Sequence, residues 1–239
     1  MHNSSVIKMK PSMKMADQID SNPRLLLMLQ HFNIDFNVSD LTVSQLCAQY
    51  DISETLFVDI ANLYNGFGTK KTHTYTKKDL LQVIDFLKNT HHYYRSDLYP
   101  QINEYIHQLQ ENHPEVRLEL KLIEKFFYQY FTEVKEHLDY EDDIAFPYFI
   151  KLLKDKSSNE ARVLYSSKEY SDHHSDIELK LHDLKNLLLK YVKVDNDLGL
   201  RRKLFFALYE LEFDLYIHSL IEESILIPSG LKIENKENA

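Results

Sequence analysis

The residues of this chain that could do chemistry are histidines and glutamates in a repeated arrangement. Two stretches share one frame, His137-Leu-Asp-Tyr-Glu141-Asp-Asp-Ile-Ala-Phe-Pro147 and His218-Ser-Leu-Ile-Glu222-Glu-Ser-Ile-Leu-Ile-Pro228. In both, a glutamate follows the histidine by four residues, and a second acid, an isoleucine, two apolar residues and a proline come after it. Side chains four positions apart lie on one face of an α-helix, so each pair could bind one ion or two neighbouring ions.

The histidine–acid spacing is not diagnostic by itself, because His31, His107 and His174 also have an acid four residues later. Such a pair is usually a surface contact that adds a few tenths of a kcal/mol to the stability of its helix. We interpret His31/Asp35 and His107/Glu111 in this way, since they lack the rest of the frame.

Each frame also follows a pair of adjacent histidines, which lie one predicted helix earlier. These pairs are His91-His92 before the first frame and His173-His174 before the second. The chain therefore contains two loose copies of one unit. In each copy, a helix with a histidine precedes a helix with His-x-x-x-Glu and a proline that we expect to end it.

The neighbours of the two frames are apolar, and we expect them to face the protein interior. They are Phe131, Val134, Leu138, Ile144, Leu215, Leu220 and Ile225. Burying imidazoles and carboxylates among such groups costs free energy unless a partner compensates them. A metal ion would do so. Mixed imidazole and carboxylate ligands suit iron, manganese or zinc, and helical bundles with inward Glu and His typically hold a two-metal site.

The elements that must position these residues are predicted to be long helices. Hydrophobic residues make up 44% of the 239-residue chain, enough for a core, whereas 4 Gly and 6 Pro are too few for the tight turns of a β-sandwich or barrel. Leu, Lys, Glu and Tyr recur in helical rhythm. We therefore predict an all-α fold, with an antiparallel four-helix bundle built from residues 77–110, 114–153, 171–194 and 198–227.

The domain organisation follows from a glycine-rich connection after residue 65. There, Gly66-Phe-Gly-Thr-Lys-Lys-Thr places two of the four glycines within three residues, which is typical of a linker. We predict a loosely ordered N-terminus, a small helical domain, a linker, the bundle and a frayed tail at residues 1–22, 23–66, 67–76, 77–230 and 231–239.

Composition and charge exclude several classes of function. The net charge of −9 argues against a nucleic-acid binder. Residues 41–64 have a helix–turn–helix pattern, but its second helix lacks Arg and Lys, and Asp51, Glu54 and Asp59 would repel phosphate. The chain shows no phosphate-binding glycine loop and no nucleophile-and-base arrangement, which argues against conventional hydrolases and nucleotide enzymes. Whether it is an enzyme of another class stays open.

The cellular location is expected to be the cytoplasm. Cys47 is the only cysteine, so no internal disulfide can form, which fits a reducing compartment. The longest apolar runs are far too short to span a bilayer.

At the two frames the sequence resembles the hemerythrin-like domain, and more closely the repair-of-iron-centres family of iron–sulfur cluster repair proteins. The similarity covers roughly residues 78 to 228. It implies two non-haem iron ions, bridged by the glutamates and an oxo or hydroxo group, with manganese or zinc as alternatives. The implied ligands are His91, His137, Glu141, His174, His218 and Glu222. The family's spacing favours His91 over His92 and His174 over His173.

The N-terminal helices also resemble the small domain that precedes the bundle in that family. The likeness rests on Leu25 to Phe36 and the helices after it. The family carries adjacent cysteines soon after its first helix, whereas the matching residues 33–38 contain none.

The resemblance implies a role in the response to nitrosative or oxidative stress, in iron–sulfur cluster repair or in handling iron or nitric oxide. The alternative is a di-iron sensor of oxygen, nitric oxide or iron, whose N-terminal domain signals to a protein partner. A passive oxygen carrier or iron store is a third reading. Oligomeric state is left open.

Overall fold

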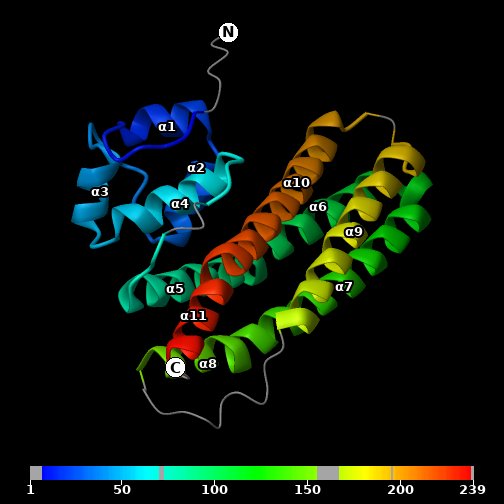
Figure 1. Cartoon of the computed structure of the whole chain (residues 1–239). Coiled ribbons are helices and arrows are strands. Elements are labelled where there is room, and N and C mark those ends of the chain that lie inside the picture. Colours follow the sequence, from blue (N-terminus) through cyan, green and yellow to red (C-terminus); the bar gives the residue numbers. More distant parts are fainter. Residues whose placement is uncertain (1–6, 70–72, 155–166, 195, 238–239) are drawn as a thin grey trace. The chain divides into compact units, whose positions relative to one another are not determined.

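The chain is all-α over the residues that the structure, a computed structural model, describes (Figure 1). These are residues 7–69, 73–154, 167–194 and 196–237, with the side chains of 167–178 and 234–237 left out. No strand occurs among them, and one isolated bridge pairs Lys14 with Thr42. The predicted fold class is therefore confirmed. No described helix combines the length and apolar character needed to cross a membrane.

The chain packs into two compact units. One comprises residues 91–148 and 158–216, and the other comprises residues 1–90, 149–157 and 217–239.

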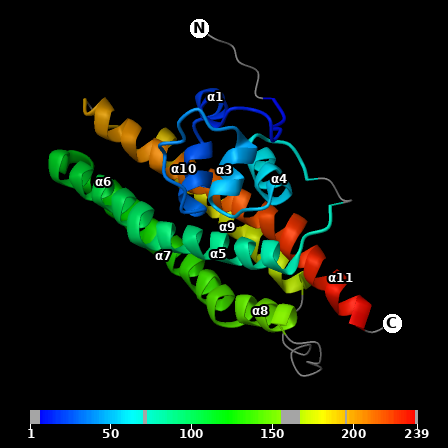
Figure 2. The ribbon, with the colours of Figure 1, turned by 90° about the vertical axis from the view of Figure 1, so that its left-hand side faces the viewer.

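The first of these units is a bundle of four long helical segments. They lie in α6 (Tyr99–Asn112), α7 (Arg117–Tyr140), α9 (Ser167–Tyr191) and α10 (Leu198–Ile221). Helix α7 packs against both α6 and α9, and the ribbons of α6 and α7 overlap in Figure 2.

The bundle core follows from the spacing of apolar residues along these helices. Helix α7 buries a stripe with spacings of three or four residues, the pattern of a helix with one inward face. The stripe consists of Leu120, Ile123, Phe127, Phe131, Val134 and Leu138. Apolar residues of α6, α9 and α10 complete the same core. The predicted helical bundle is therefore present.

The N-terminal helices belong to the other unit. They are α1 (Met15–Ser21), α2 (Leu25–His31), α3 (Val43–Gln49) and α4 (Glu54–Tyr64). Thr42 caps α3 in a reciprocal capping box with Gln45, and the Ser53 hydroxyl caps α4, so a side-chain oxygen satisfies a backbone N–H at the start of each helix. Both α2 and α3 pack against α4.

These helices contact α5 (Lys77–Tyr93) through hydrogen bonds and rings. The Asn89 amide donates to the His31 carbonyl at 2.8 Å, and the Gln82 amide donates to the Asp51 carbonyl at 2.8 Å. The His31 ring meets the edge of Phe86 with centroids 5.3 Å apart. Whether the N-terminal helices fold on their own, as the boundary at 67–76 implies, stays a prediction.

The two ends of the chain differ from expectation where they are described. Residues 15–21, expected to be loosely ordered, form α1 because tertiary contacts hold the segment: Met15 is fully buried and its N–H donates to the Leu41 carbonyl at 3.0 Å. Likewise, the Met9 N–H donates to Asn62 Oδ1 at 2.8 Å. At the other end, α11 (Ile227–Glu237) extends through most of the predicted tail.

In the part of the chain that the structure describes, three π-helical turns interrupt the long helices, and a proline follows each. The turns are η1 (Tyr94–Leu98), η3 (Glu141–Ala145) and η5 (Glu222–Leu226). The residue after each turn donates its N–H to the carbonyl five residues earlier, and the next residue is Pro100, Pro147 or Pro228.

The prediction that Pro147 and Pro228 end their helices is wrong. The chain stays helical through both prolines, in α8 (Phe146–Lys154) and α11. In a regular α-helix a proline would lack its N–H and its ring would crowd the carbonyl four residues earlier. The wider π-turn relieves this crowding just before the proline, so the helix continues with a local change of direction.

Gly230 provides a test of how tightly α11 packs. A Cβ placed on Gly230 would lie 2.5 Å from Cε1 of Phe149, whose ring is buried. We expect Gly230→Ala to lower the free energy of unfolding by about 1–3 kcal/mol, because the core must shift to accept the methyl group. Gly199→Ala in α10 is the matched control, since its Cβ would meet nothing within 4 Å.

Chemical denaturation of both variants measures the difference. Gly199→Ala should be neutral or stabilising by up to about 1 kcal/mol, because alanine has the higher helix propensity. Equal unfolding free energies for the two variants would contradict the close contact between α11 and Phe149.

Candidate metal centre

The first frame places Glu141 between two imidazoles. His91 lies near the end of α5, His137 lies in the last turn of α7, and Glu141 is the first residue of η3. Glu141 Oε2 is 3.0 Å from His91 Nε2, and Glu141 Oε1 is 3.0 Å from His137 Nε2. The side chains of His91 and Glu141 are 1% and 0% exposed, so water does not solvate this carboxylate.

The second frame repeats the pairing of histidine with glutamate. His218 lies in the last turn of α10, and Glu222 is the first residue of η5. Glu222 Oε1 is 3.4 Å from His218 Nε2, and both side chains are 2% exposed. In both frames the glutamate also provides the carbonyl that accepts the π-turn hydrogen bond. The sequence repeat is therefore a repeat of backbone geometry.

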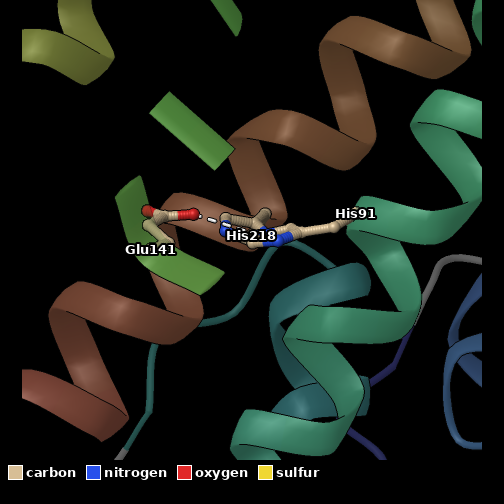
Figure 3. A group of neighbouring side chains, drawn as sticks. All are labelled: His91, Glu141 and His218. Atoms are coloured by element: carbon tan, nitrogen blue, oxygen red, sulfur yellow. Dashed lines mark ion pairs between the residues drawn. The ribbon is translucent and has the colours of Figure 1, made fainter. Parts of the chain in front are cut away.

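Among the described residues, one group of three side chains could hold a metal ion: His91, Glu141 and His218. All three are buried, and one ligand atom from each lies within 4.8 Å of the others (Figure 3). Two imidazoles and a carboxylate form a donor set that suits iron, and also manganese or zinc.

The burial of the carboxylates indicates that a cation fits here. A buried carboxylate is strongly disfavoured unless positive charge compensates it. Neutral imidazole nitrogens facing the Glu141 oxygens at 3.0 Å cannot supply that charge. Either protons on the imidazoles or a bound metal ion must do so, and the donors present are those of a metal site.

Of the six predicted ligands, three belong to this group, two lie outside it, and the side chain of one is outside the described residues. His91 is buried whereas His92 is exposed. His137 and Glu222 lie outside the group of three, but each contacts one of its members through its own frame. His173 and His174 are in α9, and their side chains lie outside the described residues. The ligand set stays a prediction.

The apolar surroundings of the frames match the sequence interpretation with one exception. Phe131, Val134, Leu138, Leu215 and Ile225 are buried, and Leu220 is half-buried. Ile144 is 43% exposed although its counterpart Ile225 is fully buried. The two frames therefore share their His–Glu pairing but not every packing contact.

A carboxylate and a guanidinium that the sequence analysis missed lie behind His91. Asp142 Oδ1 is 3.0 Å from His91 Nδ1, and Arg95 Nη1 donates to Asp142 Oδ2 at 3.1 Å. Arg95 Nη2 also donates to Asp139 Oδ1 at 2.8 Å. Burial opposes ionisation of Asp142, but His91 and Arg95 outweigh it and hold the pKa of this carboxyl below its usual value.

Arg95 follows His91 by one helical turn, which is the only local signal that could have revealed this network. The Phe146 ring also stacks on the His91 imidazole, with centroids 5.4 Å apart. The orientation of His91 is therefore fixed by its ring face and by Asp142 behind its Nδ1.

Comparison with known proteins agrees with this site. Residues 82–230 match the sequence model of the family described as hemerythrin HHE cation binding domain. The match spans both frames and all six predicted ligands. No curated protein matches the chain.

Cys47 has the environment of a structural thiol. It is 1% exposed in α3, and burial, together with the nearby Glu54 carboxylate, raises its pKa to about 12. Because the thiolate is the reactive form, we expect Cys47 in the native protein to react with Ellman's reagent far more slowly than a free thiol at pH 8. Denaturant should restore the ordinary rate, and Cys47→Ser should abolish the signal. A native rate equal to that of a small-molecule thiol would contradict this environment.

Proposed function

The chain belongs to the hemerythrin HHE cation-binding domain family, and from that premise we propose that it is a non-haem di-iron protein. The observation that carries this proposal is the burial of Glu141 and Glu222, each held by the histidine of its own frame. Two buried carboxylates need two sources of positive charge. The His91, Glu141 and His218 group supplies a donor set that iron accepts.

We propose that the protein serves in the nitrosative or oxidative stress response, through iron–sulfur cluster repair or the handling of iron or nitric oxide. A di-iron centre would supply redox chemistry and positions at which oxygen or nitric oxide could bind. The chain's own residues hold its ligands: Asp142 and Phe146 fix His91. Cys47 is buried with a raised pKa, so repair would depend on the metal centre and not on a thiol of this chain.

The alternative is a di-iron sensor that signals through the N-terminal helices to a protein partner. One observation favours it: Asn89, which donates to the His31 carbonyl of α2, lies two residues before the ligand candidate His91 on α5. A single helix therefore carries both a candidate ligand and a contact with the N-terminal helices.

Metal content tests the centre itself. We expect protein purified without oxygen to contain about two iron ions per chain, as in other bundles with paired Glu and His ligands. On exposure to air, it should show near-ultraviolet bands of an oxo bridge. His137→Ala/His218→Ala should lose both the iron and the bands, because one imidazole disappears from each frame. His92→Ala, which removes an exposed neighbour, is the matched control and should retain them. Wild-type protein without iron, or iron retained in the double variant, would overturn the proposal.

The choice between repair and sensing needs a second measurement. An iron–sulfur enzyme inactivated by nitric oxide should regain activity when mixed with the iron-loaded protein and a reductant if the protein repairs clusters. The double variant His137→Ala/His218→Ala should not restore it. Nitric oxide binding, seen as a new absorption band, without any restored activity would contradict repair and support the sensor.

A further inference from the structure

A buried hydroxyl group contacts the histidine of the second frame. Thr90 lies in α5 and is 1% exposed. Its Oγ1 donates to the Leu87 carbonyl at 2.7 Å, and the same oxygen lies 2.7 Å from His218 Nδ1. Thr90 and His218 are 128 residues apart in sequence, so no local sequence pattern predicts this contact.

The number of hydrogen atoms fixes the direction of both hydrogen bonds. A threonine hydroxyl has one hydrogen and can accept through its lone pairs, whereas a carbonyl can only accept. If the Thr90 hydrogen pointed at His218, the hydroxyl and the Leu87 carbonyl would be two acceptors 2.7 Å apart. The hydrogen therefore points at Leu87, and His218 Nδ1 must donate to Thr90. Neutral His218 then carries its proton on Nδ1 and its lone pair on Nε2.

We propose that Thr90 is a positioning residue that fixes the tautomer and the ring orientation of His218, so that Nε2 is the metal-binding atom. This inference rests on the proposed metal centre. His218 Nε2 lies 3.4 Å from Glu222 Oε1, so the proposed cation would be bound on this side of the ring. Metal-binding histidines commonly donate their second N–H to a nearby acceptor, which sets the tautomer and the ring plane.

The two candidate ligands His91 and His218 therefore have different supports. His91 has the carboxylate of Asp142 behind its Nδ1, whereas His218 has the neutral hydroxyl of Thr90. A carboxylate acceptor raises the basicity of an imidazole ligand more than a neutral hydroxyl does. The two histidines are therefore ligands of unequal donor strength. Asp142 is the second acid of the first frame, whereas Thr90 lies outside both frames.

Substitutions of Thr90 test whether its hydroxyl group positions His218, with the affinity of the protein for metal as the measurement. Thr90→Val keeps the side-chain shape without the hydroxyl, and Thr90→Ser keeps the hydroxyl without the methyl group. Thr132→Val is the matched control, because the Thr132 hydroxyl donates to the Tyr128 carbonyl at 2.9 Å on the exposed face of α7. Competition of each protein with a chelator for Fe²⁺, without oxygen, measures affinity.

Thr90→Val should bind Fe²⁺ about 10–100-fold more weakly, the usual effect of removing such a support. Thr90→Ser and Thr132→Val should stay close to wild type. Thermal unfolding of the metal-free variants shows whether each is folded. An affinity of Thr90→Val equal to wild type, or an equal loss in folded Thr90→Ser, would overturn the proposal, because the hydroxyl would then not matter.

The tautomer itself gives a readout that does not depend on bound metal. Long-range ¹H–¹⁵N correlation spectra of the metal-free protein at pH 8 distinguish a proton on Nδ1 from one on Nε2, and the His218 signal is identified by its loss in His218→Gln. We expect Nδ1 to carry a proton in wild type and Thr90→Ser, whether or not Nε2 is also protonated, and to lose it in part or entirely in Thr90→Val. A proton on Nε2 alone in wild type would overturn the assignment.

The two proposals fail in different ways. If wild-type protein binds no Fe²⁺, the proposed function is wrong. The positioning role of Thr90 is then wrong as well, even if the tautomer of His218 is as expected. Wild-type protein that binds Fe²⁺ no better than Thr90→Val would remove only the role of Thr90.

Discussion

The burial of two glutamates is the constraint on which this structure depends. Glu141 and Glu222 are removed from water, and a carboxylate in such a place destabilises the fold unless positive charge and hydrogen bonds compensate it. The compensation comes from histidines placed one turn before each glutamate and from His91 on α5. Those imidazoles are themselves buried or nearly so, and they need partners in turn. Asp142 and Thr90 supply those partners. Each buried polar group therefore depends on another for its partner. A cation balances the negative charge of the whole group.

The π-turns are the backbone counterpart of this arrangement. A π-turn is rare in proteins and is frequently found at functional sites. Here η3 and η5 begin at the two buried glutamates. The prolines after them fit this geometry, since proline has no N–H to place in the ladder. The third turn, η1, follows His91 by three residues and precedes Pro100. The helices that carry His91, Glu141 and Glu222 therefore leave the regular α-helical path at or just after these residues, whereas α9, which carries His174, stays regular.

The sequence predicted what is set by local periodicity and missed what is set by distant contacts. The pairing of His137 with Glu141 and of His218 with Glu222 follows from the helical repeat, and the structure shows both. The role of the prolines was misread, because the rule that proline ends a helix assumes α-helical hydrogen bonds before it. Helix α1 was missed because the Leu41 carbonyl and the burial of Met15 hold it, and neither is visible within residues 1–22. Thr90 could not be found at all, since its partner lies on another helix.

Three consecutive residues of α5 show how a metal site and the N-terminal helices could be coupled. Successive side chains on an α-helix point in different directions. Asn89 binds the His31 carbonyl of α2, Thr90 binds His218, and His91 contacts Glu141 and Asp142. A ligand can shift such an arrangement only by the difference in its affinity for two states. A diatomic molecule or a change of iron oxidation state would therefore reach the N-terminal helices only if it altered the preferred position of His91 or His218. The contacts of Asp142 with His91 and of Thr90 with His218 resist that movement. Their strength therefore sets how much of the ligand's binding free energy could be transmitted along α5.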